Sequence, residues 1–583
     1  MSLILRTSRV SRAAGREIVA SLLVLSAACS SAKDNVHEVV DAGADDVGQG
    51  VDGDGGSVDD GGSVDDGPAS DGIEMSDAAP VDEGGEGGGA DHFQNLGFEN
   101  GSAGWTFAGD LAASYVESLS PHSGRRDLAF WSATDYAVNV EQTIQTLEAG
   151  PYTVRAWVKS STTIGNSYLF WRSADVEKTV PIPAGLSSAL RLTIPDVAVN
   201  GCPCTVGVHV EGPAQSSLAL DDIEVIAGAP QIDPAYLLGG DITFRRLLAD
   251  RGVQFFDAAA GETEVLDLLQ QKGFNFVRIR IYNSPGSPDH FPSSQLPPGF
   301  QDLPDALVNA REAAARGMQI LLSFHYSDSW TNPGTQYKPY QWEGLTLAQL
   351  TSAVYTYTVD AMRALEAQGT PPAIVTLGNE TNPGMMWPEG QIGSNGENFA
   401  AFAQLFNAGQ LAVKEVFPSA KVAVHLANPE QRPDLWLSWA KARGLRYDVV
   451  GLTLYPFWSG MRIDAMKAVI RQIVTTYGKE VVAVETGFPW SLVRENGYPT
   501  LISSNALSPQ GTETFGVSPD GQGLYLRSFF QQMHEVHGFV GALYWDPIWI
   551  DTPQLSSNVG DTALFDWDAR PLPGLDAFGE KFW

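Results

Sequence analysis

The hydrophobic pattern changes once in the folded part of the chain, near residue 229. Residues 93–228 contain short stretches in which apolar and polar positions alternate, such as PYTVRAWVKS and CTVGVHVEG, separated by Gly, Pro, Asn and Ser. A period of two with such turns indicates antiparallel strands. We therefore expect a β-sandwich over 93–228.

Residues 229–583 follow a different pattern, in which apolar runs alternate with stretches whose apolar residues recur every three or four positions. The apolar runs are YLLGGDITF, FNFVRIRIY, MQILLSFHY, AIVTLGNE, KVAVHLA, DVVGLTLYPF, VVAVET and FVGALYWDP. The stretches between them include ETEVLDLLQQKG, LPDALVNAREAAARG, FAAFAQLFNAGQLAVKEV and IDAMKAVIRQIVTTYG, which have helical periodicity. Strands that alternate with helices form right-handed parallel units, and eight units close into a (β/α)8 TIM barrel.

Residues 1–29 have the features of an export signal. Arginines precede the apolar run IVASLLVLSAA, which ends at Cys29 and is shorter than the ~20 residues of a membrane-spanning helix. LSAACS resembles a bacterial lipoprotein signal, in which Cys29 would be lipidated, although Leu25 lies one position too early. We expect a cell-surface or outer-membrane lipoprotein, with ordinary secretion as the alternative.

Residues 30–92 are rich in Asp and Gly and contain few large apolar side chains. Such a segment cannot bury enough surface to fold, so we expect a disordered, self-repelling tether. Its Asp-Gly runs lack the ligand spacing of a calcium loop. The net charge of −33 argues against nucleic acid as a partner.

The chain has three cysteines, and Cys29 is accounted for by the signal. The remaining pair, Cys202 and Cys204, is separated by one residue, a spacing that suits no common zinc site. An exported location permits a tight local disulfide between them. We expect a loop feature without chemistry.

Polar or aromatic residues lie at the end of nearly every predicted barrel strand, where the reacting groups of this fold are found. They are Arg278, Arg280, His325, Asp328, Asn379, Glu380, His425, Tyr455, Glu485 and Trp545. A single glutamate is most often a surface or ion-pair residue, but two at the ends of the fourth and seventh strands favour an active site. Two opposed carboxylates are what cleavage of a glycosidic bond requires, one protonated and one ionised. Arg278 is the natural partner of an ionised Glu485.

The motifs GGDIT, VRIRIYNSP, FHYSDSWTNPG, GNETNPGMMWP, HLANP, GLTLYPFW, VETGFPW, LYWDPIWI and TALFD occur in order along the barrel. With them, residues 236–583 resemble glycoside hydrolase family 53, the retaining arabinogalactan endo-β-1,4-galactanases. The resemblance implies hydrolysis of galactan or arabinogalactan without a cofactor, with Glu380 as acid/base and Glu485 as nucleophile.

The resemblance also implies roles around this pair. Asn379 should contact the sugar 2-hydroxyl, and Tyr455 should steady the nucleophile. Residues expected to line the subsites are His325, Asp328, Trp330, Trp387, His425, Trp545 and Trp549. A buried structural role is the rival for the histidines, and core packing is the rival for the tryptophans.

Two departures from the family stand out. Asp546 replaces a glutamate found in many members, and SLVRENGYPTLISS lacks the calcium-binding series of some bacterial relatives. We therefore expect no calcium in the barrel. The rival functions are another β-1,4-glycanase of the same clan, such as a mannanase or xylanase, and a non-catalytic polysaccharide-binding lipoprotein.

The ends of the predicted sandwich, NLGFENGSAGWTFAG and LALDDIEVI, resemble those of jelly-roll carbohydrate-binding modules. The resemblance implies sugar binding and a structural calcium near Glu99 and Asp222. Aromatic side chains that can stack on sugars are Trp105, Trp131, Trp157, Trp171, Tyr136 and Tyr168. Core packing is the rival reading, and we prefer it for Trp157. We expect a monomer.

Overall fold

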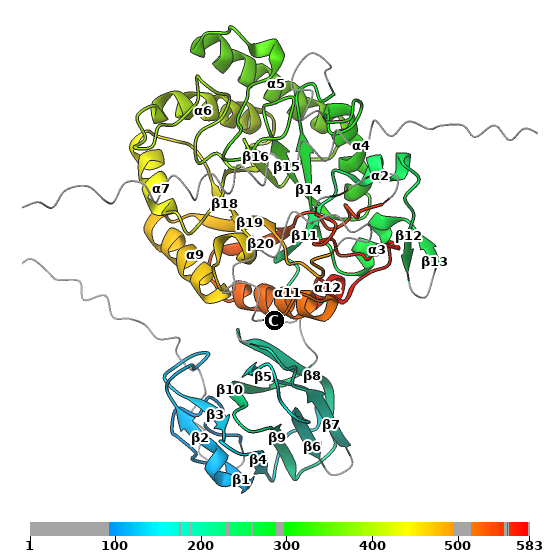
Figure 1. Cartoon of the computed structure of the whole chain (residues 1–583), viewed down its shortest axis with the longest axis vertical. Coiled ribbons are helices and arrows are strands. Elements are labelled where there is room, and N and C mark those ends of the chain that lie inside the picture. Colours follow the sequence, from blue (N-terminus) through cyan, green and yellow to red (C-terminus); the bar gives the residue numbers. More distant parts are fainter. Residues whose placement is uncertain are drawn as a thin grey trace, which may run out of the picture.

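The computed structural model describes residues 92–580, except 174–175, 187, 229–232, 258–260, 287–295, 494–514, 553–554, 556 and 558. The predicted signal, Cys29 and nearly all of the acidic tether lie outside the described residues. No helix in the described ranges is long and apolar enough to span a membrane. Two folded parts follow one another along the chain (Figure 1).

The first part is the predicted β-sandwich, with two five-stranded antiparallel sheets. One sheet has the order β1 (Thr106–Gly109), β4 (Tyr136–Ile144), β9 (Cys204–Gly212), β6 (Tyr168–Ser173), β7 (Val176–Pro181). The other has the order β2 (Ser114–Glu117), β3 (Asp127–Trp131), β10 (Ser217–Ala227), β5 (Gly150–Ser160), β8 (Leu190–Val199). Buried and more exposed positions alternate along β4, because successive side chains of a strand point to opposite faces.

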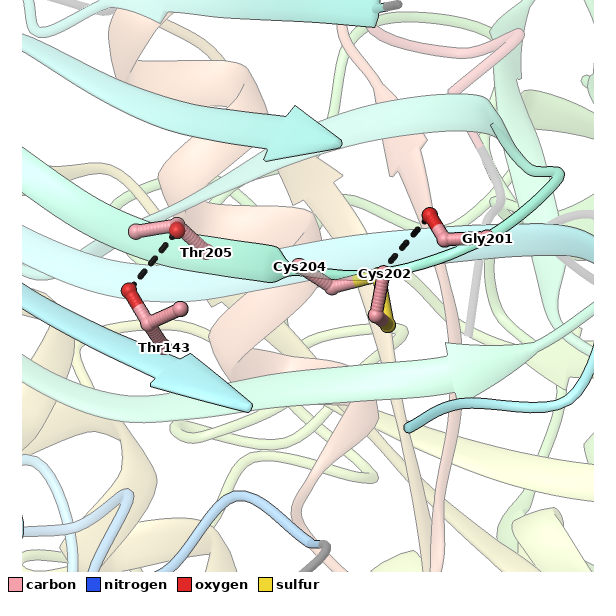
Figure 2. Close-up of a disulfide and its surroundings, with 5 residues drawn as sticks. All are labelled: Thr143, Gly201, Cys202, Cys204 and Thr205. Atoms are coloured by element: carbon pink, nitrogen blue, oxygen red, sulfur yellow. Dashed lines mark hydrogen bonds between the residues drawn. A yellow bond between two sulfur atoms is a disulfide. The ribbon is translucent and has the colours of Figure 1, made fainter. Parts of the chain in front are cut away.

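The expected local disulfide is present between Cys202 and Cys204, with an S–S distance of 2.23 Å (Figure 2). It lies where the chain enters β9. Beside it, the hydroxyls of Thr143 and Thr205 are 2.8 Å apart across the β4–β9 pair.

Most of the six sandwich aromatics are not available to a ligand. Trp105, Tyr136 and Trp171 belong to the hydrophobic core, so the expectation that they stack on sugars is wrong for these three. Trp131, at the end of β3, is 45% exposed. Tyr168 is half-buried and begins β6, whose next side chain, Leu169, points into the core.

The second part is the predicted barrel, a closed ring of eight parallel strands. In order around the ring they are β11 (Leu237–Asp241), β14 (Phe276–Ile281), β15 (Gln319–Phe324), β16 (Ile374–Leu377), β17 (Lys421–Leu426), β18 (Val449–Leu454), β19 (Glu480–Thr486) and β20 (Phe539–Tyr544). Each strand coincides with one of the eight predicted apolar runs, although β19 begins one residue before its run, at Glu480. The closed ring confirms the (β/α)8 fold.

Helices lie around the ring of strands (Figure 1). Those with the predicted periodicity are α3 (Val265–Gln271), α4 (Leu303–Ala314), α6 (Phe399–Val416) and α9 (Ile463–Tyr477). The others are α2 (Arg245–Asp250), α5 (Leu347–Gln368), α7 (Pro433–Ala442), α8 (Pro456–Ser459), α11 (Pro519–His534) and α12 (Pro573–Asp576). Two single turns are η1 (Leu111–Ala113) and η2 (Tyr340–Trp342).

The stretch ETEVLDLLQQKG is only partly helical. Its first residues belong to a short hairpin of β12 (Phe255–Asp257) and β13 (Gly261–Thr263). The helix begins after Glu264, whose side chain accepts hydrogen bonds from the backbone amides of Leu266 and Asp267. Capping of these otherwise unpaired amides fixes where the helix starts.

The sandwich contacts the barrel through α11. The Gln531 side chain accepts from the backbone amide of Arg191, at 2.9 Å, and donates to its carbonyl, at 3.2 Å. Ser528 and Gln532 both donate to the carbonyl of Ala189 at 2.8 Å. These side chains therefore complete the hydrogen bonds of backbone beside and within β8.

Trp157 lies at this same contact rather than in the sandwich core. His122 stacks on its ring, with centroids 3.9 Å apart, and the His122 imidazole reaches Asp222 at 2.8 Å and Glu535 at 3.2 Å. Trp157 is buried, as expected, but it is absent from the sandwich core cluster. Its ring is covered by His122, which is far away in the sequence.

Candidate active site

Arg278 on β14 is the centre of the site at the carboxyl ends of the barrel strands. It is fully buried, and its guanidinium donates to Glu485 Oε1 at 2.5 Å and to Asn379 Oδ1 at 2.7 Å. The predicted pairing of Arg278 with Glu485 is therefore present. One cation joins residues from the second, fourth and seventh strands of the barrel.

Glu485, on β19, has a second donor. The Tyr455 hydroxyl, immediately after β18, donates to its other oxygen at 3.0 Å. A buried carboxylate that accepts one bond from an arginine and one from a phenol is stabilised in its charged form. The arrangement suits an anionic nucleophile.

Glu380, three residues after the end of β16, has a contrasting environment. Its side chain accepts a hydrogen bond from the Thr453 hydroxyl at 2.9 Å. Burial, followed by the charge of Glu485, raises the pKa of Glu380 to about 8, while Thr453 and Arg278 act in the opposite direction. Glu380 is therefore mostly protonated at neutral pH, as a general acid must be.

The backbone at Glu380 has a φ of 51°. This is the left-handed region, which a residue with a Cβ seldom adopts and which is found at functional sites where the surrounding structure holds it. The Thr381 amide that follows donates to the carbonyl of His425 on β17 at 2.7 Å. That bond fixes the turn that presents Glu380.

The two predicted histidines are buried. Burial, with Arg278 as a second cause, lowers the pKa of both His325 and His425 well below the ordinary value. Both imidazoles are therefore neutral at neutral pH. His325 Nδ1 lies 2.7 Å from the Thr331 hydroxyl, and His425 Nε2 lies 2.9 Å from the Thr453 hydroxyl.

Asn379 and Asp328 are held by the protein at both ends. The Asn379 amide donates to the carbonyl of Thr331 at 2.9 Å while its oxygen faces Arg278. Asp328 accepts from the backbone amides of Ser284 and Tyr340, each at 2.8 Å. Asp328 thus ties together the loops that follow β14 and β15.

Asp546 lies in a second buried network rather than on an open surface. Its carboxylate is fully buried and lies 3.5 Å from Arg280, which also contacts Asp241 at 2.9 Å. Burial, with the charge of Asp241 next, raises the pKa of Asp546 well above the ordinary value. The residue that departs from the family pattern therefore has no exposed surface in this structure. Asp546 instead pairs with Arg280 inside the protein.

The predicted subsite tryptophans divide into exposed and buried members. Trp330 and Trp387 are half-buried and retain surface for a sugar. Trp545 is largely buried and meets the Tyr455 ring edge-on. Trp549 is 1% exposed and stacks on Phe244 with centroids 4.1 Å apart. Trp549 therefore lies inside the protein, and the expectation of sugar stacking is wrong for it here.

Sequence reasoning missed Asp241 and Thr453. Both lie in motifs that were recognised, GGDIT and GLTLYPFW. Thr453 is two positions before Tyr455, and side chains two apart on a strand face the same way. This alternation could have identified Thr453 as a residue of the barrel interior.

The two sandwich carboxylates proposed to bind calcium already accept hydrogen bonds from other residues of the protein. Glu99 accepts from the backbone amides of Arg125 and Arg126, and Asp222 pairs with His122. Over the described ranges, no group of three or more His, Cys, Asp or Glu side chains is arranged to hold a metal ion. A calcium ion near Glu99 and Asp222 stays a prediction.

Comparisons with known proteins agree with this geometry. A family model described as Glycosyl hydrolase family 53 matches residues 237–578. The arabinogalactan endo-beta-1,4-galactanase of Cellvibrio japonicus is 31% identical over 323 residues, which cover 54% of this chain and 81% of that protein. The structure of the Ignisphaera aggregans GH53 catalytic domain is similar with a TM-score of 0.56 and 29% identity, covering 61% of this chain and 98% of that one. A structure of two fungal beta-1,4-galactanases is similar with a TM-score of 0.50 and 28% identity, covering 59% and 98%.

Proposed function

Because this chain belongs to glycosyl hydrolase family 53, we propose that it is a retaining endo-β-1,4-galactanase acting on pectic galactan or arabinogalactan. The observation that carries the proposal is the contrast between the two glutamates. Glu485 accepts from Arg278 and Tyr455, whereas the pKa of Glu380 is raised to about 8. A carboxyl group that can give a proton, opposite a carboxylate oriented by an arginine and a phenol, is the equipment of a glycosidase.

In the first step the Glu485 carboxylate attacks the anomeric carbon and Glu380 gives its proton to the departing glycosidic oxygen. The bond between the two sugars breaks as the bond to Glu485 forms. Arg278 and Tyr455 orient the attacking carboxylate, and Asn379, fixed by Arg278, faces the same region.

In the second step Glu380 acts as a base. Once Glu485 is esterified its charge is gone, and that charge is one of the causes that raise the pKa of Glu380. The pKa of Glu380 must therefore fall in the intermediate. Its carboxylate then accepts a proton from the water that attacks the anomeric carbon, which releases Glu485 and retains the β configuration.

The direct test is incubation of the purified protein with linear β-1,4-galactan, and with mannan and xylan as matched polymers. We expect new reducing ends from galactan, with the β anomer appearing first by proton NMR. The variants Glu380→Gln and Glu485→Gln should lose this activity, whereas the exposed control Glu366→Gln should keep it.

Each rival function predicts a different result. Cleavage of mannan or xylan in place of galactan would identify another glycanase of the clan. Binding of galactan without cleavage of any polymer would identify a non-catalytic surface protein, in which the opposed glutamates have no role.

We also propose that the sandwich binds the polysaccharide and holds the barrel close to it. Trp131 and Tyr168, the two aromatics of the predicted set that keep exposed or half-buried surface, support this proposal. Affinity electrophoresis of the Glu485→Gln protein in galactan gels tests it. Trp131→Ala or Tyr168→Ala should then weaken retardation, and unchanged retardation in both would refute it.

We further propose that the protein is exported and anchored to the outer membrane through a lipid on Cys29. The support is the sequence alone: a basic start, an apolar run and the cysteine in LSAACS. An acidic tether would then give the folded domains reach from the membrane surface.

A further inference from the structure

The Thr453 hydroxyl lies between a histidine and the acid/base glutamate. It is 2.9 Å from His425 Nε2 and 2.9 Å from Glu380 Oε1. Thr453 and His425 are both buried, on the neighbouring strands β18 and β17. The three side chains form one chain of hydrogen bonds that ends on the carboxyl group.

The direction of this chain follows from which atoms have partners. His425 is neutral, so only one of its ring nitrogens carries a hydrogen. Its Nδ1 has no hydrogen-bond partner among the described residues. A buried donor without a partner is rarer than a buried acceptor without one, so we assign the hydrogen to Nε2. His425 then donates to Thr453, which leaves the single hydroxyl hydrogen of Thr453 for Glu380.

The two oxygens of Glu380 are thereby made unequal. Oε1 accepts from Thr453, and no side chain in the described ranges donates to Oε2. A proton on Oε1 would meet the hydroxyl hydrogen, so the proton of the acid form belongs on Oε2. We propose that Thr453, oriented by His425, is a positioning residue that keeps the acid proton of Glu380 on Oε2. This inference rests on the proposed glycosidase function.

The same hydrogen bond favours the charged form of Glu380, because a hydroxyl donates more strongly to a carboxylate than to a carboxylic acid. The other titratable or charged groups that face Glu380 are Glu485, Arg278 and Tyr455, and His425 reaches it through the Thr453 hydroxyl. A change at Thr453 leaves the hydrogen bonds of Glu485, Arg278 and Tyr455 in place, but it removes the acceptor of the His425 Nε2 hydrogen. A variant that removes only the hydroxyl therefore tests the joint effect of Thr453 and His425 on the protonation of Glu380.

The experiment compares Thr453→Val, which keeps the shape, with Thr453→Ser, which keeps the hydroxyl. We expect the alkaline limb of kcat/KM on linear galactan to move up by about one pH unit in Thr453→Val. The plateau value should fall about tenfold, because the proton is no longer confined to one oxygen. Thr453→Ser should return both quantities toward those of the unaltered protein.

Several outcomes overturn the inference without touching the proposed function. They are an alkaline limb that does not move in Thr453→Val, a uniform loss of kcat/KM at every pH, or a Thr453→Ser protein as impaired as Thr453→Val. If Thr453→Val does not fold, Thr453→Ala must show the same displaced limb. Failure of the unaltered protein to cleave galactan would instead refute the proposed function.

Discussion

The protonation state of Glu380 gives the sharpest prediction about this protein. With a pKa of about 8, Glu380 is protonated in about nine molecules out of ten at pH 7 and in about one out of ten at pH 9. At its ordinary pKa of 4.5, about 0.3% would be protonated at pH 7. We therefore expect kcat/KM on galactan to fall about tenfold between pH 7 and pH 9, as the acid is lost.

The variant Glu380→Ala tests whether loss of the Glu380 proton causes this fall in kcat/KM. On galactan, whose leaving group needs a proton, activity should fall by about 10²–10⁴-fold. On an activated substrate such as dinitrophenyl β-galactobioside, the first step needs no acid. The kcat/KM of Glu380→Ala on that substrate should not change between pH 7 and pH 9. The release of dinitrophenol is followed at a wavelength at which its absorbance does not depend on pH.

Azide separates the two glutamates on the same substrate. In Glu380→Ala the covalent intermediate forms on Glu485 but lacks a base for its hydrolysis, so azide should attack it and give a β product. In Glu485→Ala no intermediate forms, and azide in the vacated space should give an α product. Opposite configurations would reverse the assignment of roles.

The pH reasoning itself is refuted if Glu380→Ala retains a tenfold decline in kcat/KM on the activated substrate. Another group would then control the limb. Unchanged hydrolysis of galactan by Glu380→Ala would remove it from the mechanism altogether. Glu366→Gln, an exposed glutamate on α5, controls for the loss of a carboxylate elsewhere.

Three further predictions concern the rest of the chain. Cys29→Ala should release the protein from the membrane fraction, and release of the unaltered protein into the medium would contradict lipidation. Deletion of 93–228 should lower activity on insoluble galactan and spare soluble oligosaccharides, whereas equal loss on both would make the sandwich a stability element. His122→Ala should lower the free energy of unfolding by about 1–3 kcal/mol at pH 5 and by less at pH 9, and an equal loss at both pH values would count against it. Burial opposes the charge on His122, but its hydrogen bonds to Asp222 and Glu535 raise its pKa above the ordinary value. The stability that His122 contributes is therefore fully present below the pKa of the unfolded state. It is lost as the pH rises through the pKa of the folded state.

The local pattern of the sequence determined the architecture and the positions of Glu380 and Glu485. The eight apolar runs became the eight barrel strands, because a strand buried on both faces needs a continuous apolar run. Glu380 and Glu485 could be chosen because the ends of parallel strands must meet at one face of a barrel. Arg278 could be matched to Glu485 because both chemistry and strand position allowed that pair.

Contacts between residues that are distant in the sequence decided which of the predicted side chains are exposed. Trp549 was expected to face a sugar and is instead covered by Phe244, and Asp546 is buried 3.5 Å from Arg280. A chain's pattern says that such residues follow a strand, but their exposure depends on which side chains from other strands fill the space above them.

The same limit explains what sequence reasoning missed at the site and at the sandwich. Thr453 reads as an ordinary strand residue until the barrel closes and brings it within 2.9 Å of Glu380, 73 positions away. Trp157 has the pattern of a core residue, but in the folded protein His122 stacks on its ring and pairs with Glu535. The sequence by itself determined which elements form and where the carboxylates lie, because both follow from local periodicity. Only the tertiary structure decided the protonation of Glu380 and the direction of its hydrogen bonds, because these depend on burial and charge contributed by other strands.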